Sequence, residues 1–78
     1  MSKKQLMRIY SLHRFLAAKK RIPTSQLCKR LEVSRATLFR DIDILKSIGA
    51  PVSYCYLTRI HQYTAEFELT LEELVEKI

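Results

Sequence analysis

Inward-facing residues recur at three- and four-residue spacing along the first part of the chain. This spacing predicts an amphipathic helix over residues 3–18, formed by Leu6, Ile9, Tyr10, Leu12, His13 and Leu16. The cations of residues 19–21 suit the negative end of that helix's dipole. A connector over 22–24 follows, in which Thr24 is the expected N-cap. A second, short helix is predicted over 25–31, with inward-facing Leu27, Cys28 and Leu31.

A longer helix is predicted over residues 34–48. Ser34 is placed to cap its first turn, and Gly49 is the residue best able to end it in a left-handed conformation. Only Glu32 and Val33 separate this helix from the short one, which predicts a tight turn between them. The buried stripe repeats at positions i, i+4 and i+7 and consists of Leu38, Ile42 and Leu45.

Beyond Gly49 the apolar spacing changes to two, which predicts two strands in a wing over residues 52–69. Residues 57–60 are the expected connection. The alternating residues are Val52, Tyr54 and Tyr56 in the first strand, and Tyr63, Ala65, Phe67 and Leu69 in the second. Their aromatic members are expected in the core between sheet and helices, together with Tyr10. Thr70 and Glu73 have capping-box spacing and open a final helix over 70–78.

The predicted elements fit one fold class. It is mainly α with a small β-hairpin, a winged helix-turn-helix with a three-helix core, a two-stranded wing and a C-terminal helix. The 78 residues leave no room for a second core, so residues 1–78 are expected to form a single domain.

Charge divides the chain into two unequal parts. Residues 1–48 contain twelve Lys or Arg against three acidic residues, whereas residues 49–78 contain two cations against five Glu, and the net charge is +6. This asymmetry indicates one surface that faces a polyanion and another that points away from it. The cationic run at 19–21 fits either a solvated surface or contacts with a nucleic-acid backbone.

Several function classes are disfavoured by what the sequence lacks. No catalytic triad, Cys–His pair or glycine-rich phosphate loop is present, so we expect no enzyme and no cofactor. Cys28 and Cys55 are too few and too far apart to hold a metal, and are expected as reduced core thiols. No apolar run is long enough to span a membrane and the N-terminus does not resemble a signal peptide, which predicts a cytoplasmic protein, associated with the nucleoid in a bacterium.

The outward face of the 34–48 helix carries the candidate chemistry, which consists of Arg35, Ala36, Phe39, Arg40, Asp43 and Lys46. Arg35 can fork onto guanine acceptors, and Ala36 and the Thr37 methyl can meet a thymine methyl. Phe39 is apolar on a polar face, where a base or sugar would give it a partner, and Arg40 is better placed for phosphate. The alternative is that the cations are only solvated and that Phe39 packs on the wing or on a neighbouring molecule.

The segment Val33-Ser34-Arg35-Ala36-Thr37-Leu38-Phe39-Arg40-Asp41-Ile42, with Leu45 and then Gly49-Ala50-Pro51-Val52, resembles a known family. It is similar to the N-terminal winged helix-turn-helix of DeoR-like regulators, and most of all to those with a WYL ligand-binding domain. The resemblance covers about residues 6–69. It implies a third helix in the major groove and a wing beside the DNA backbone.

Carried over residue by residue, the resemblance implies DNA contacts from Ser34, Arg35, Thr37 and Arg40. It implies a supporting role for Asp41, which orients an arginine or a helix. The chain departs from the family pattern at Ala36, where an Arg is frequent. It departs again at His61-Gln62-Tyr63, which replaces the usual Gly-Gly-Tyr, and Arg59 is then the wing's only cation. His61 is expected as a surface imidazole, and His13 as a structural residue.

Two functions therefore remain open at the level of sequence. The first is sequence-specific binding of double-stranded DNA as part of a transcriptional regulator. The second is a winged helix that binds protein or a second copy of itself. The exposed apolar residues that would serve this second function are Phe39 and those of the last helix, 70–78, whose apolar stripe suits a homodimer, a following effector domain that is missing here, or a fragment of a longer chain. That stripe consists of Leu71, Leu74, Val75 and Ile78.

Overall fold

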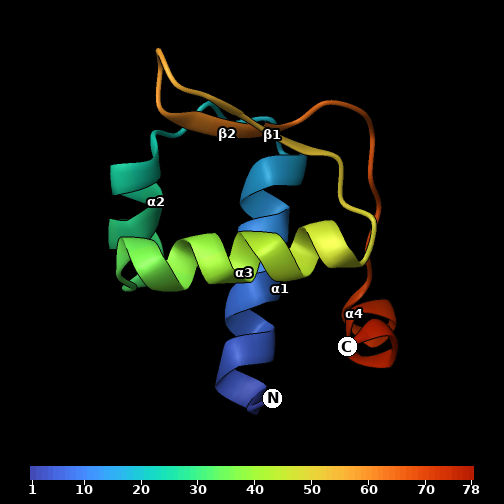
Figure 1. Cartoon of the computed structure of the whole chain (residues 1–78). Coiled ribbons are helices and arrows are strands. Elements are labelled where there is room, and N and C mark those ends of the chain that lie inside the picture. Colours follow the sequence, from blue (N-terminus) through green and yellow to red (C-terminus); the bar gives the residue numbers. More distant parts are fainter.

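The computed structural model describes all 78 residues. It contains four helices and one two-stranded antiparallel sheet (Figure 1). The elements in chain order are α1 (Lys3–Ala17), α2 (Thr24–Leu31), α3 (Arg35–Ser47), β1 (Val52–Cys55), β2 (Ile60–Tyr63) and α4 (Leu71–Lys77). This order confirms the predicted fold class, a mainly helical chain with a small hairpin in a winged helix-turn-helix arrangement.

Serine side chains begin two of the helices. Ser2 accepts a hydrogen bond from the backbone N–H of Gln5 at 3.1 Å at the start of α1. Ser34 accepts one from the N–H of Thr37 at 3.2 Å at the start of α3, as predicted. Beyond α3, Gly49 has a φ of +105°, so the predicted left-handed end is also confirmed.

The start of α2 differs from the prediction. Thr24 lies inside the helix and Pro23 takes the N-cap position without a side-chain hydrogen bond. The Thr24 hydroxyl is occupied elsewhere, since it donates to the backbone carbonyl of Arg59 at 3.0 Å. Between α2 and α3 the predicted tight turn is present, and Glu32 closes it with a φ of 56°.

The second strand of the wing also differs from the prediction. It runs over Ile60–Tyr63 and pairs with β1 in the register Val52↔Tyr63, Ser53↔Gln62, Tyr54↔His61 and Cys55↔Ile60. Residues 64–69, which were expected to continue as a strand, leave the sheet after Thr64 donates to the Pro51 carbonyl at 2.8 Å. Phe67 and Leu69 pack on the core from an extended segment, so their alternating pattern indicated burial rather than strand pairing.

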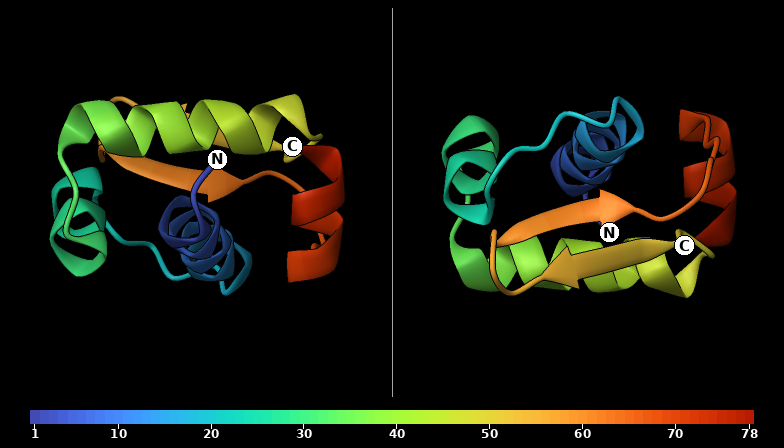
Figure 2. Two further views of the ribbon diagram at one scale, coloured as in Figure 1. Left: turned by 90° about the horizontal axis from the view of Figure 1, so that it is seen from below. Right: turned by 90° about the horizontal axis from the view of Figure 1, so that it is seen from above.

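One hydrophobic core joins these elements. α1 lies between α2 and α4, α3 crosses α1, and the sheet covers one end of the helices (Figures 1 and 2). The predicted stripe of α3 is fully buried, and so is Leu74 of α4. The twelve buried residues of the core are Ile9, Leu12, Leu16, Ile22, Leu27, Leu38, Ile42, Leu45, Ala50, Tyr63, Leu69 and Leu74.

Two expectations about buried residues are wrong. Tyr56 was expected in the core, but it lies in the turn between the strands and is 85% exposed. Cys55 was expected as a core thiol, but it lies half-exposed at the end of β1, where hydrogen bonding from Thr58 lowers the pKa of its thiol. Cys28 is half-buried and packs on the core. Both cysteines are free thiols.

The last helix begins with the predicted capping box. The Thr70 hydroxyl accepts from the N–H of Glu73 at 3.1 Å, and the Glu73 carboxylate accepts from the N–H of Thr70 at 3.2 Å. Leu74 fixes α4 against α1, whereas Val75 and Ile78 remain 52% and 46% exposed. None of the helices has the length and apolar character that a membrane span requires.

Candidate nucleic-acid interface

The N-terminal end of α3 presents most of the predicted contact residues to solvent. Arg35, Ala36 and Arg40 are exposed, and Thr37 is partly buried. The exposed Ser34 hydroxyl both accepts from the Thr37 N–H and donates to the Thr37 hydroxyl at 3.2 Å. These two side chains therefore fix the geometry of the first turn, while Arg35, Ala36 and Arg40 are free to meet a ligand.

Phe39 has a partner within the protein. Its half-buried ring meets the edge of Tyr54 with centroids 6.4 Å apart, and it lies 5.4 Å from the His61 ring. Both partners are in the wing. The wing therefore accounts for an aromatic side chain on this face, as the alternative interpretation of the sequence required, and a DNA contact is not needed to explain it.

The same ring supports Arg35. The Arg35 guanidinium lies 5.4 Å from the centre of the Phe39 ring, one turn along α3. A guanidinium stacked on an aromatic face keeps its N–H groups available at its edge, and loses less conformational freedom when it binds. Phe39 thus acts as a platform that restricts Arg35 to the outer face of α3.

A groove of about 390 Å³ separates α3 from the wing. Its lining combines aromatic and apolar side chains with the cations of Arg35 and Lys46 and the carboxylate of Asp43. The residues that line it are Arg35, Phe39, Ile42, Asp43, Lys46, Tyr54, Tyr56 and His61. This combination suits a ligand that carries both negative charge and apolar or ring surface, as a nucleic-acid strand does.

His61 does not lie on the surface, contrary to expectation. It is only 4% exposed, and its Nδ1 lies 3.2 Å from the Thr24 hydroxyl. Because that hydroxyl donates its single proton to the Arg59 carbonyl, the His61 Nδ1 carries a hydrogen and donates it to the Thr24 hydroxyl. Burial, with the positive charges of Lys46 and Arg35 adding to it, lowers the pKa of His61 to about 4.

Thr24, Arg59 and His61 together attach the wing to α2. The Thr24 N–H donates to the Arg59 carbonyl at 2.9 Å, and Pro23 forms a β-bridge with Ile60. The connector between α1 and α2 thus lies beside β2 as a third extended segment. The sequence did not indicate this contact, because a single bridge at Pro23 has no alternating pattern.

Asp41 has the supporting role that was expected of it. Its carboxylate is fully buried and accepts two hydrogen bonds from Arg8 of α1, from Nε at 2.6 Å and from Nη2 at 3.1 Å. The hydrogen bond with Asp41 also raises the pKa of Arg8. This ion pair fixes α3 across α1. Sequence reasoning missed Arg8, although the spacing of Asp41 within the buried stripe could have revealed that it points inward.

His13 is structural, as predicted. It is 5% exposed, and its Nδ1 lies 2.9 Å from the Tyr63 hydroxyl, which joins α1 to β2. Burial lowers the pKa of His13 and raises that of Tyr63. Neither residue reaches the face that carries Arg35. Arg59, by contrast, is exposed in the wing turn with a φ of 59°.

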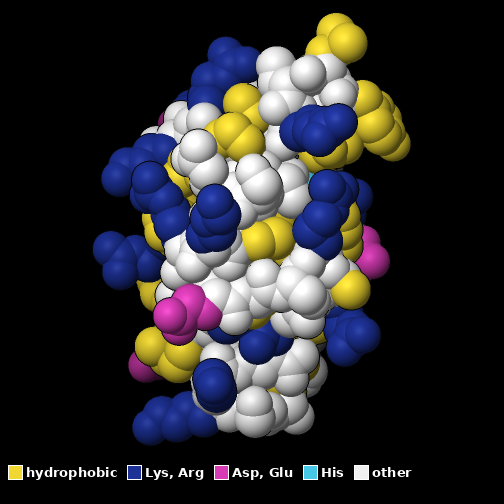
Figure 3. All heavy atoms as spheres, turned by 90° about the vertical axis from the view of Figure 1, so that its left-hand side faces the viewer, with side chains coloured by type: hydrophobic (Ala, Val, Ile, Leu, Met, Phe, Trp, Pro, Cys, Tyr) yellow, Lys and Arg dark blue, Asp and Glu magenta, His cyan; other side chains and the backbone are white.

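Basic side chains gather on one face of the molecule. Figure 3 shows Lys and Arg side chains spread over the face on which α2 and the N-terminal end of α3 lie, with few acidic ones among them. A polyanion is the partner that such a surface attracts over distance. The exposed cations of α2, of the first half of α3 and of the connector before α2 are Lys19, Lys20, Arg21, Lys29, Arg30, Arg35 and Arg40.

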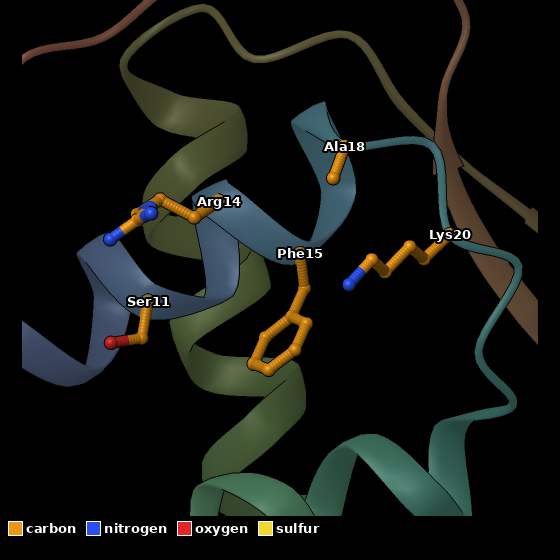
Figure 4. Close-up of a pocket in the computed structure, with 5 residues that line it drawn as sticks. All are labelled: Ser11, Arg14, Phe15, Ala18 and Lys20. Carbon is orange, nitrogen blue, oxygen red and sulfur yellow. The ribbon is translucent and has the colours of Figure 1, made fainter.

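A second hollow, of about 280 Å³, lies on α1 (Figure 4). The Phe15 ring points towards α2, where the Arg30 guanidinium lies 5.8 Å from its centre, and the Lys20 side chain extends towards Phe15 while Arg14 points away. The lining residues are Ser11, Arg14, Phe15, Ala18 and Lys20. This hollow extends the cationic surface and contains no further reactive group.

Comparison with known families agrees with this geometry. Residues 8–53, more than half of the chain, match the family described as HTH domain. The chain belongs to the helix-turn-helix (HTH) domain family. The match begins in α1, includes α2 and α3, and ends at β1, so it covers the helices that carry the cationic face. No curated protein and no solved structure is significantly similar to the chain.

Membership of the HTH family indicates a DNA-binding domain and makes DNA the implied partner. Domains of this kind typically carry no enzymatic activity.

Proposed function

We propose that this domain binds double-stranded DNA sequence-specifically, as the DNA-binding module of a transcriptional regulator, with α3 in the major groove. The observation that carries the proposal is the exposed first half of α3, with Arg35 stacked on Phe39 and Arg40 free, in a domain of the HTH family. The basic face around it supplies the attraction to phosphates that DNA binding requires.

The contact residues have separate roles in this proposal. Arg35 reads a base, guanine being the best match for a forked donor, and Ala36 and Thr37 lie against the adjacent base edges. Arg40 contacts a phosphate. Phe39 positions Arg35, and a contact between Phe39 and a sugar is of secondary importance. Ser34 fixes the first turn and lies close to the backbone, and Arg59 contacts a phosphate from the wing.

The proposal also concerns the subfamily to which the domain belongs. The segment 33–52 favours a DeoR-like domain of the kind that precedes a WYL ligand-binding domain. A regulator of that kind would continue beyond residue 78 into an effector-binding domain. The exposed side chains of Val75 and Ile78 on α4 are suited to pack against such a domain.

A selection from randomised duplex DNA tests the main proposal. We expect a recovered consensus, and the double variant Arg35→Ala/Arg40→Ala should lose binding at physiological salt. Lys77→Ala is the matched control, because it removes a cation from α4, away from α3. Unchanged binding by the double variant, with its fold intact by circular dichroism, would contradict the assignment of α3.

A second candidate function rests on α4. Its exposed Val75 and Ile78 suit association with a second copy of the chain, and a dimer would place two α3 helices for a palindromic site about one DNA turn between half-site centres. The solution mass, measured by light scattering, tests this candidate. A dimer that Val75→Glu converts to a monomer supports it, whereas a monomer at all concentrations contradicts it. Self-association without any duplex binding would favour an interaction module over the main proposal.

A further inference from the structure

The turn between the strands carries the two most exposed large apolar side chains of the chain. Tyr56 is 85% exposed and Leu57 is 95% exposed. Tyr56 meets the edge of Tyr54 with ring centroids 5.0 Å apart, whereas the Leu57 side chain is almost entirely in water. Any partner that removes this apolar surface from water lowers the free energy of the complex.

This turn is held firmly at its base. The Arg59 N–H donates to the Cys55 carbonyl at 2.7 Å, and the Arg59 carbonyl accepts from both the N–H and the hydroxyl of Thr24. The neutral, buried His61 completes the attachment through Thr24. The tip is therefore anchored to α2, and Leu57 is presented outwards by a preorganised loop.

Charge around the tip favours a polyanionic partner. Arg59 lies within the turn, and Arg21 is close enough to influence the Cys55 thiol at the end of β1. Hydrophobic atoms project at the top of Figure 3, at the wing end of the molecule and above its basic face. Phosphates on either side of an inserted apolar group would meet these cations.

The dimensions of the molecule indicate which part of a duplex the tip reaches. The longest extent is 35 Å, close to one turn of B-DNA at ~34–36 Å. α3 crosses the middle of the molecule and the tip lies at one end (Figure 1). With α3 in a major groove, the tip therefore reaches the neighbouring minor groove, which lies about half a turn away.

We propose that Leu57, supported by Tyr56, inserts into the minor groove as an apolar wedge that opens one base step and bends the duplex. Wedges of this kind partially unstack a step and favour flexible pyrimidine–purine sequences. The inference rests on the proposed DNA binding and adds a second determinant of sequence preference, one that acts through deformation rather than base contacts.

Variants at the tip distinguish a Leu57 side chain that inserts between bases from one that only lies near phosphates. The probe is a 25–30 base-pair duplex recovered by selection with the whole chain. Leu57→Ala should weaken binding about tenfold, because a large apolar side chain loses its burial, and should leave the salt dependence unchanged. Leu57→Lys should also weaken binding. A tip that only lies near phosphates would bind more tightly with the added lysine, which would overturn the wedge.

Val75→Ala is the matched control for this series. Val75 belongs to the α4 face that is a candidate dimer contact, so this control is read together with Met7→Ala, which removes a 44% exposed apolar side chain from α1 where neither a DNA contact nor a dimer contact is proposed, and Met7→Ala should leave duplex affinity unchanged. The Leu57 side chain contributes little to the folded core, so its variants should keep the wild-type melting temperature. Leu57-dependent self-association without an effect on duplex affinity would assign the tip to a second copy of the chain and overturn the wedge.

Base unstacking provides the direct measurement. Single 2-aminopurine substitutions, moved along the selected duplex, should show one position about half a turn from the α3 site whose fluorescence rises with wild type and not with Leu57→Ala. Salt-dependent duplex binding without this rise overturns the wedge and leaves the proposed function intact. Absence of duplex binding by the wild-type chain overturns both.

Discussion

At the scale of single residues, the candidate interface separates side chains that touch DNA from side chains that position others. Arg35 and Arg40 are exposed and have no acidic partner, whereas Phe39 packs against Tyr54 and His61. This division predicts that substitutions along one face of α3 will have different effects. Substitution of a contact residue should change the affinity for DNA or the sequence preference. Substitution of a positioning residue should change both, because it displaces the contact residue beside it.

Arg40→Ala and Arg35→Ala should therefore have distinct signatures. Loss of Arg40 should weaken all duplex sequences alike and lower the slope of log K against log salt by about one, because a phosphate contact is lost. Loss of Arg35 should relax preference at one base pair by ~1–3 kcal/mol. Fluorescence anisotropy with single-base variants of the selected site, at several salt concentrations, measures both. Identical sequence profiles for the two variants would contradict this division.

His61 should make the stability of the domain depend on pH. Its pKa is about 4 in the folded chain and near 6.5 in an unfolded chain, so the unfolded state binds the proton first as pH falls. The contribution of the neutral His61 to the free energy of unfolding is fully present above pH 6.5. It declines as the pH falls from 6.5 to 4 and is lost below that. The two pKa values differ by about 2.5 units, so at ~1.4 kcal/mol per unit the full loss of unfolding free energy is on the order of 3 kcal/mol.

Urea denaturation at pH 7 and pH 5 measures this dependence. His61→Gln keeps a polar side chain near Thr24 but cannot take up a proton, so its stability should change less between the two pH values. The buried His13 remains in both proteins and cancels in the comparison. Equal pH dependence in the variant and the wild type would assign the effect to other groups.

At the scale of elements, the orientation of α3 depends on one ion pair. Asp41 is buried, whereas the Arg8 side chain is 21% exposed, so the two partners are not equivalent. Arg8→Ala leaves an unpaired carboxylate in the core and should cost about 3–5 kcal/mol of unfolding free energy. Asp41→Ala leaves an arginine that can turn to solvent and should cost less, about 1–3 kcal/mol.

A double-mutant cycle checks this asymmetry. The double variant should be less destabilised than the sum of the single ones, because neither charge is then left without its partner. Urea midpoints of the four proteins provide the values. Additive costs, or a larger cost for Asp41→Ala, would contradict the proposed role of the pair.

At the scale of the whole molecule, charge asymmetry should govern association with DNA. Twelve of the fourteen cations lie within residues 1–48, on helices α1 to α3 and the connector before α2, and most of the acidic residues lie after the sheet, around α4. This distribution orients the domain towards a duplex and keeps the α4 face directed away from it. Affinity for duplex DNA should therefore contain a large electrostatic part.

A salt titration measures that part. With about four phosphates neutralised, affinity should fall roughly 100-fold between 50 and 200 mM salt, since each contact contributes ~0.9 to the slope. The variant Lys77→Ala, on α4, should follow the wild-type line. A nearly flat line for the wild type would show that the basic face of Figure 3 does not meet phosphate.

The sequence by itself determined the helices and most of their ends, with the start of α2 as the exception. Apolar spacing, the serine caps, Gly49 and the capping box at Thr70 act within a few residues, so their outcome does not depend on the rest of the chain. The exposed face of α3 follows from the same periodicity. Because these signals are local, the pattern of the HTH motif could be recognised from the sequence.

Only the tertiary structure decided how distant segments meet. The partner of Asp41, the burial of His61 and the anchoring of the wing through Thr24 join residues 33 to 37 positions apart in the chain. A local pattern indicates that a side chain is buried, but not against what. For the same physical reason residues 64–69 alternated like a strand and packed without a strand partner, and Phe39 found its partner in the wing.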